Sequence, residues 1–185
     1  MHRLNTLLVA ALMAAACLPT ATSQTFENVY SLPDPGSHPV APLIKTPTGS
    51  FLGTASGGGG NNFGSIFQVT PQGEVTRLVS FNGLNGLLPD GGLTLGNDGK
   101  YYGVTIGGGQ GDRGTAFRVS AAGQFESLVN FSSISAPSPT GQIVQGSDGN
   151  FYGLCSDSVS NPTDAGAIFK PVSYTHLTLP TNREV

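Results

Sequence analysis

Aspartates are the residues of this chain whose side chains could carry out chemistry, because paired carboxylates hydrolyse glycosidic bonds. The candidates in the central region are Asp90, Asp98, Asp112, Asp148, Asp157 and Asp164. Asp98 and Asp148 recur 50 residues apart, each directly before a glycine, which indicates a turn rather than a reaction centre. The other aspartates do not recur between copies, and their spacing does not force any two of them to lie close to the same glycosidic bond. We therefore expect no catalytic residues and no enzyme.

Cofactor and metal sites are not expected either. Gly109-x-Gly111-x-x-Gly114 has the spacing of a dinucleotide fingerprint, but such a site needs a helix after it, and Thr115 to Val119 alternates like a strand. His38 and His176 are too few for a zinc site or a serine triad. Calcium binding through Asp112, Asp157 or Asp164 stays an alternative, although Asp112 lies one residue out of the register of calcium-binding glycine repeats and the first copy has no acidic residue in its loop.

The N-terminus has the anatomy of a secretory signal peptide. Arg3 supplies the positive charge, Leu7 to Leu18 is an uncharged and mostly apolar run, and Ala21-Thr22-Ser23 is a cleavage site before Gln24. Residues 1–23 are therefore expected to be removed, giving a secreted or cell-surface protein. An uncleaved anchor and lipoprotein processing at Cys17 are the alternatives. No later apolar run is long enough to span a membrane.

Charge and cysteine content argue against a nucleic-acid-binding protein and against a fold held by disulfide bonds. The formal net charge is −3, and the basic residues are scattered, which argues against a nucleic-acid partner. Removal of the signal peptide leaves Cys155 as the remaining cysteine, so the fold must do without an internal disulfide. Cys155 occupies the place of Ala55 and Thr105 in a repeat described next, and we expect a small buried side chain there rather than a reactive thiol.

An internal repeat with a period of 50 residues organises the chain. Its anchors are Pro39-x-x-x-Leu43, Pro89-x-x-x-Leu93 and Pro139-x-x-x-Ile143, then Gly49-x-Phe51-x-Gly53, Gly99-x-Tyr101-x-Gly103 and Gly149-x-Phe151-x-Gly153, then Gly64-x-x-Phe67, Gly114-x-x-Phe117 and Gly166-x-x-Phe169. The last spacing is 52 because one loop is longer. The copies are taken as 26–73, 74–123 and 124–171, which together make the repeat region 24–171.

Each copy is predicted to form four short strands. In the middle copy they are Val75 to Phe81, Gly92 to Leu95, Lys100 to Thr105 and Thr115 to Ser120. Four strands in about 50 residues match one blade of a β-propeller, and closure needs about 4–8 blades. The sequence therefore predicts an all-β fold of three blades of an incomplete propeller. The recurring Gly53, Gly103 and Gly153 are expected to let a neighbouring blade approach. A β-solenoid and an open sandwich are the alternatives.

Two resemblances follow from these motifs. Leu78-Val79-x-Phe81, Asp98-Gly99-x-Tyr101-Tyr102-Gly103 and the Gly114 to Gly123 stretch resemble the GloVer tandem repeat of exported bacterial proteins. That resemblance implies a secreted or surface repeat protein and carries over no catalytic residue.

Residues 172–185 resemble translated sequencing-adapter DNA and leave the repeat frame. We expect this tail to be non-native and further repeats of the same chain to be missing.

The long loops are the expected place of function. Asn82 to Asp90 and Ile106 to Asp112 should share one rim of the blade, where ligands of rigid β scaffolds bind. Gln110, Asp112 and Arg113 are the expected polar contacts. The leading hypothesis is a non-catalytic exported protein, structural or binding an extracellular glycan or protein. A fragment of a secreted propeller enzyme, a glycoside hydrolase or lyase acting on polysaccharide, is the alternative.

Overall fold

The computed structural model describes residues 38–132, 138–156 and 166–170, and every regular element in them is a β-strand. The first sheet contains β1 (Ile44–Lys45), β2 (Phe51–Ala55), β3 (Ser65–Val69) and β4 (Val75–Ser80). The central sheet contains β5 (Leu87–Pro89), β6 (Thr94–Leu95), β7 (Tyr101–Gly107), β8 (Thr115–Val119) and β9 (Phe125–Asn130). The third sheet contains β10 (Pro139–Gln145), β11 (Phe151–Cys155) and β12 (Ala167–Phe169). No helix among these residues is long and apolar enough to cross a membrane.

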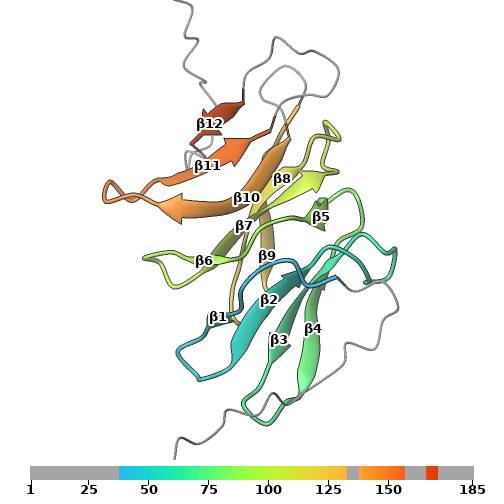
Figure 1. Cartoon of the computed structure of the whole chain (residues 1–185), viewed down its shortest axis with the longest axis vertical. Helices are drawn as coiled ribbons and strands as arrows, with labels where there is room; N and C mark the ends of the chain where they lie inside the picture. The colour runs from blue at the N-terminus through green and yellow to red at the C-terminus, as the bar shows by residue number, and fades with distance from the viewer. Residues whose placement is uncertain (1–37, 133–137, 157–165, 171–185) are drawn as a thin grey trace, which may run out of the picture.

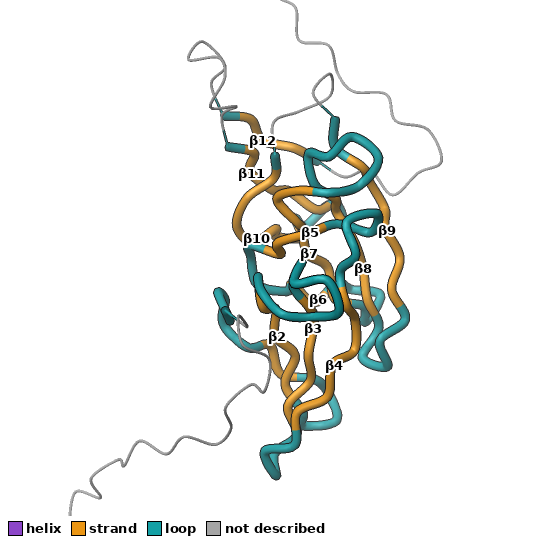
Figure 2. Tube along the Cα trace, turned by 90° about the vertical axis from the view of Figure 1, so that its right-hand side faces the viewer, coloured by secondary structure: helices purple, strands orange, loops and turns teal. Residues whose placement is uncertain are grey.

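Every strand pairs antiparallel with the next strand across its sheet. The orders are β1-β2-β3-β4, β5-β7-β8-β9 with β6 also paired to β7, and β10-β11-β12. The three sheets succeed one another along the long axis of the molecule (Figure 1), and the tube view shows strands joined by loops throughout (Figure 2). The all-β prediction is confirmed, and the first sheet has the predicted four strands, whereas the central sheet has five and the described part of the third sheet has three.

The sheet boundary is shifted relative to the sequence copies. β4 pairs with β3, Val69 opposite Val75, so this strand closes the first sheet. The sequence frame placed the same stretch at the start of the second copy. Both frames share one period. The chain simply passes from one sheet to the next after β4 rather than before it.

A short strand was also missed inside the predicted loop from Asn82 to Asp90. In β5, Leu87 pairs with Gly107 and Pro89 pairs with Thr105. Three residues that include a proline and Leu88 at a φ of 54° give no alternating pattern, so the sequence did not reveal this edge strand. The other middle-copy strands lie where they were expected.

The hairpin turns follow the predicted chemistry. Gly49, Gly99 and Gly149 occupy the same turn in each sheet, with φ of 89°, 76° and 80°. The Gly99 N–H donates to the Gly96 carbonyl at 3.0 Å, which closes the turn. A side chain is disfavoured at such angles, so glycine recurs at this position.

The central sheet packs on both of its faces. Tyr101 and Val119 join a buried cluster with Leu52 and Ile66 of the first sheet. Tyr102 joins a second cluster with residues of the third sheet, among them Ile143, Phe151 and Cys155. Adjacent tyrosines therefore point to opposite faces, as expected for a strand. Face-to-face stacking of four-stranded units is the arrangement of consecutive propeller blades.

The recurring glycines act within one sheet rather than between sheets. A Cβ on Gly103 would lie 2.7 Å from the Phe117 ring, and one on Gly53 would lie 2.5 Å from the Phe67 ring. Each phenylalanine comes from the neighbouring strand of the same sheet and lies across the glycine. The expected role in blade approach is therefore wrong for these positions. That role belongs to Gly91, whose Cβ would meet the Gly141 carbonyl at 2.1 Å.

Hydrogen bonds join the central and third sheets through residues about one period apart. The Thr140 hydroxyl donates to Asp90 Oδ2 at 2.7 Å, across 50 positions of sequence. Gln142 Nε2 donates to the Leu93 carbonyl at 3.1 Å, across 49 positions. The Asn97 N–H donates to Gln145 Oε1 at 2.9 Å, across 48 positions. We call this row of bonds the period ladder.

Candidate functional site

The long loops do lie together at one rim. The loop 82–86 enters the central sheet from β4, and the loop 108–114 joins β7 to β8. The Gly109 N–H donates to the Gly83 carbonyl at 2.8 Å and ties the two loops to each other. These two long loops thus lie side by side, and we call the surface that they form the long-loop rim.

The first of these loops is locked by its own asparagines. The Asn82 N–H donates to Asn85 Oδ1 at 2.8 Å, and the Asn85 N–H donates to Asn82 Oδ1 at 3.0 Å. Gly83 and Gly86 exchange backbone hydrogen bonds inside the same loop. Leu84, at the tip, is 83% exposed. The loop therefore has a fixed backbone and presents an apolar side chain to water.

Asp112 has a structural task that the sequence analysis did not foresee. Its Oδ1 accepts a hydrogen bond from the Gly108 N–H at 3.2 Å, and its own φ is 51°. Asn62, one period earlier, accepts from the Gly58 N–H at 2.9 Å at a φ of 59°. The side-chain oxygen closes the loop in both copies. The recurrence of Asn or Asp at this spacing was the signal that could have revealed it.

The other two predicted contacts share that hairpin with Asp112. Gln110 is exposed, and its N–H donates to Asn130 Oδ1 at 3.2 Å, which fixes the loop tip against β9. Arg113 is half-buried just before β8. The structure thus brings Gln110, Asp112 and Arg113 onto one preformed hairpin of the long-loop rim.

The opposite rim carries the repeated Asp-Gly turns. Asp98 accepts from the Lys100 N–H at 3.1 Å and from the Tyr102 hydroxyl at 2.8 Å. Burial alone would raise the pKa of Asp98, but these hydrogen bonds and the nearby Lys100 and Arg118 charges lower it overall. Asp98 is therefore an ionised hydrogen-bond acceptor for groups at the start of the strand that follows the turn. This agrees with the prediction that Asp98 has a structural role in a turn.

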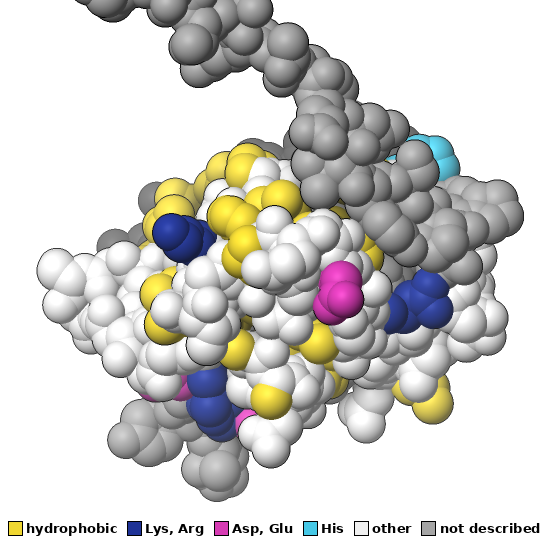
Figure 3. Space-filling view, turned by 90° about the horizontal axis from the view of Figure 1, so that it is seen from below, with side chains coloured by type: hydrophobic (Ala, Val, Ile, Leu, Met, Phe, Trp, Pro, Cys, Tyr) yellow, Lys and Arg dark blue, Asp and Glu magenta, His cyan; other side chains and the backbone are white. Residues whose placement is uncertain are grey.

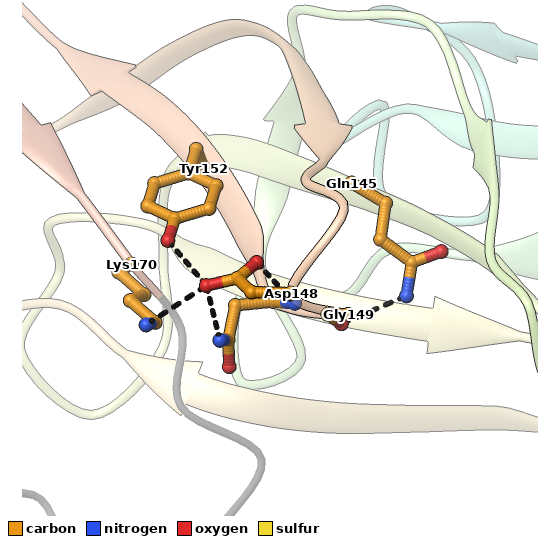
Figure 4. Close-up of polar contacts among 6 residues, drawn as sticks. Gln145, Asp148, Gly149, Tyr152 and Lys170 are labelled. Atoms are coloured by element: carbon orange, nitrogen blue, oxygen red, sulfur yellow. Dashed lines mark hydrogen bonds and ion pairs between the residues drawn. The ribbon is translucent and has the colours of Figure 1, made fainter.

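The third sheet repeats this arrangement. Asp148 accepts from the Asn150 N–H at 3.1 Å and from the Tyr152 hydroxyl at 2.7 Å, while Lys170 Nζ lies 3.4 Å from Asp148 Oδ2 (Figure 4). Hydrogen bonds from the Asn150 side chain and from Tyr152 hold the pKa of Asp148 well below its usual range. The Asp-x-x-x-Tyr spacing at Asp98 and Asp148 carries this contact, and sequence reasoning had read only the turn.

A cleft of about 310 Å³ opens between the central and third sheets beside these turns. Its polar lining comprises Asn97, Asp98, Tyr102, Arg118, Gln145 and Asn150. The charged groups already have partners, because Arg118 pairs with Glu126 at 2.8 Å. Phe151 stacks on Tyr102 with ring centroids 3.9 Å apart and covers one face of that ring. The cleft therefore offers a ligand few free groups.

The other residues and motifs that were considered for catalysis or for cofactor and metal binding have structural roles where the structure describes them. Asp90 belongs to the period ladder, and β8 follows the Gly109 to Gly114 motif as the predicted strand instead of a nucleotide-binding helix. Within the described ranges, no group of three or more histidine, cysteine or acidic side chains could hold a metal ion. Asp157 and Asp164 lie outside the described residues, as do the predicted signal peptide (1–23) and residues 172–185.

Cys155 and His38 are placed differently. Cys155 is 4% exposed, and burial raises the pKa of its thiol to about 11, so a small buried side chain is confirmed. His38 is exposed, and its carbonyl accepts a hydrogen bond from the Ser56 N–H at 2.9 Å.

Comparison with known proteins supports the repeat assignment. A family model described as the Gloeobacter/Verrucomicrobia repeat matches residues 18–179, in agreement with the motif resemblance. No curated protein matches the chain. Among solved structures, an X-ray structure provisionally named a gluconolactonase matches with a TM-score of 0.42 and 16% identity. The match covers 61% of this chain and 40% of that protein, so the chain spans less than half of its length. At this similarity no activity is transferred, and the fold rests on the strand pairing of the chain itself.

Proposed function

Because the chain belongs to the Gloeobacter/Verrucomicrobia repeat family, we propose that it is an exported, non-catalytic repeat protein that binds an extracellular glycan or protein through its long-loop rim. The observation that carries this proposal is the preformed double loop. The Gly109–Gly83 bond and the paired asparagines hold the loop that carries Leu84 against the hairpin of Gln110. Rigid loops lose little conformational entropy on binding.

The chemistry of the long-loop rim suits recognition rather than catalysis. It combines an exposed aliphatic side chain with amide, carboxylate and guanidinium groups on one surface. Export is supported by the resemblance of residues 1–23 to a secretory signal peptide. Figure 3 shows that charged side chains are few and separate on the face seen from below, so nothing there suggests a nucleic-acid surface.

A co-sedimentation assay tests the proposal. The chain is incubated with insoluble cellulose, chitin and peptidoglycan sacculi, and the bound fraction and the sugar released into the supernatant are both measured. We expect binding to at least one polymer with no release of reducing ends or unsaturated products. Polymer cleavage that depends on an aspartate would establish the polysaccharide enzyme instead.

Matched variants locate the binding surface. Gln110→Ala and Arg113→Ala should weaken binding, and Asp112→Asn should do so while leaving the loop closed, because Asn62 closes the equivalent loop. Gln124→Ala, exposed beside the short turn of the opposite rim, should leave binding unchanged. Equal loss in all variants, or none in the rim variants, would exclude the long-loop rim as the site.

A further inference from the structure

The loop 82–86 contains the two Asn-Gly pairs of this sequence, Asn82-Gly83 and Asn85-Gly86. In such a pair the backbone nitrogen of the glycine can attack the side-chain amide of the asparagine, because the glycine has no Cβ to hinder the approach. An asparagine followed by a larger residue, such as Asn150 before Phe151, lacks this freedom. The two residues that lock the loop are therefore also the asparagines of the chain that are most open to attack by their own backbone.

Asn85 is held against this reaction by its surroundings. Its Oδ1 accepts from the Asn82 N–H at 2.8 Å and its Nδ2 donates to the Ser80 carbonyl at 3.3 Å, so both ends of the side-chain amide are bonded. Gly86, which would supply the attacking nitrogen, is buried, and a Cβ on it would lie 2.5 Å from Thr105 Oγ1. Movement of either group would therefore break hydrogen bonds and meet packed atoms.

Asn82 is held less firmly. It is exposed, and its Oδ1 accepts from the Asn85 N–H at 3.0 Å, but its Nδ2 has no hydrogen-bond partner among the described residues. Gly83 has more room than Gly86, because a Cβ on it would first meet the Phe63 ring at 3.5 Å. The remaining obstacle is the hydrogen bond that the Gly83 N–H donates to the Gly86 carbonyl at 3.1 Å. Attack on Asn82 therefore needs only a local opening of the loop.

We propose that Asn82 is a site of spontaneous deamidation in the folded protein. The Gly83 nitrogen gives up its proton to hydroxide and attacks Asn82 Cγ. A bond forms between this nitrogen and Cγ, the bond between Cγ and Nδ2 breaks, and Nδ2 takes up a proton from water and leaves as ammonia. Water then opens the resulting succinimide at either of its two carbonyls, which gives aspartate or isoaspartate at position 82.

Isoaspartate at this position releases the loop. The backbone gains a methylene group and the side chain loses one, so the carboxylate no longer lies where Asn82 Oδ1 accepts from the Asn85 N–H. The same change displaces the Gly83 carbonyl, which accepts from the Gly109 N–H at 2.8 Å and joins the two long loops. The long-loop rim therefore contains a slow chemical change that separates its two loops, whether or not the rim binds a ligand.

Peptide mapping by mass spectrometry tests the proposal on the full chain. The protein is aged in neutral buffer, conversion is followed separately at Asn82, Asn85 and Asn150, and isoaspartate is identified by enzymatic methylation. We expect Asn82 to convert at least about fivefold faster than Asn85, the factor that corresponds to one additional hydrogen bond, and Asn150 to convert slowest. In urea, both Asn-Gly pairs should convert faster than in the folded chain and at similar rates.

Two results would overturn the proposal. One is conversion of Asn85 as fast as that of Asn82 in the folded chain, and the other is conversion of neither faster than that of Asn150. An equally strong preference for Asn82 in urea would also refute the reasoning, because the preference would then come from the local sequence and not from the fold.

A variant of the lock gives an independent test. Asn85→Ala removes the acceptor of the Asn82 N–H, so the loop opens more easily and conversion at Asn82 should be faster by about fivefold. Leu84→Ala, at the exposed tip, should leave that rate unchanged. An unchanged rate in Asn85→Ala would contradict the proposed opening.

Hydrogen exchange of the aged parent chain tests the release of the loop without any variant. The Asn85 and Gly109 amide hydrogens should exchange faster in the fraction that contains isoaspartate than in fresh protein, because both lose their acceptors. Equal exchange in the two fractions would show that the loop stays locked and would overturn this consequence.

Discussion

Replacement of Tyr101 by phenylalanine should stabilise the protein. The Tyr101 side chain is 0% exposed, and its hydroxyl has no hydrogen-bond partner among the described residues. Burial also raises the pKa of this phenol, as expected for a group removed from water. The other copies have Phe51 and Phe151 at the same position, so the ring fits there without its oxygen.

The magnitude follows from the cost of an unpaired polar group. Burying a hydroxyl without a partner costs about 1–3 kcal/mol. Removal of the oxygen relieves this cost, but it also removes a few van der Waals contacts, which reduces the gain in stability by a few tenths of a kcal/mol. We expect Tyr101→Phe to raise the free energy of unfolding by about 1 kcal/mol, which corresponds to roughly 4 °C in Tm for a domain of this size. Urea denaturation and calorimetry measure both quantities.

The neighbouring tyrosine is the matched control. The Tyr102 hydroxyl donates to Asp98 Oδ2 at 2.8 Å, so Tyr102→Phe removes a hydrogen bond. Because Asp98 stays in contact with water, the expected loss is only about 1 kcal/mol. The two substitutions should thus differ in sign. If Tyr101→Phe destabilises the protein as much as Tyr102→Phe does, the Tyr101 hydroxyl has a partner and the reasoning fails.

Three further predictions concern the same sheets. Gly103→Ala should cost about 1–3 kcal/mol in urea denaturation because its Cβ meets the Phe117 ring, whereas Gly60→Ala, in open space, should stay within about 0.5 kcal/mol. Asp98 has a lowered pKa, so its stabilising effect is present above the ordinary value of 3.8 and is lost as pH falls through the folded value. Asp98→Asn should therefore reduce the fall in Tm between neutral and acid pH, and an unchanged fall would contradict this. With Cys17→Ser to remove the other thiol, a thiol reagent should label Cys155 only in denaturant, and rapid labelling of the folded chain would show that it is accessible.

Repetition made the strands predictable, because the same anchors mark the same turns in each copy. Gly99 and Gly149 end their hairpins for a local reason, the positive φ of the turn, and local reasons can be read from sequence. The phase of the sheets could not be read in this way. A period fixes spacing but not where one sheet ends, and only the pairing of β4 with β3 decides that.

The candidate site was predictable in position but less so in role. Alternating long and short loops placed Gln110 and Asp112 on the long-loop rim. The loop-closing hydrogen bond of Asp112 depends on a left-handed backbone conformation, which cannot be predicted from the sequence of one loop alone. The contact between Tyr102 and Asp98 depends on a rotamer, so residue type alone indicated a turn and not a bond.

The period ladder has a consequence for how the gene can change in length. Its bonds join residues 48 to 50 positions apart, so duplication or deletion of one whole unit gives every sheet a neighbour of the same register. A frame-preserving change of one residue inside a strand would instead put side chains on the wrong face. Loops absorb smaller changes, as the two extra residues between Gly153 and Gly166 illustrate. Unequal recombination between copies would therefore yield longer or shorter arrays that still fold, and array length can vary far more freely than the sequence of any one unit.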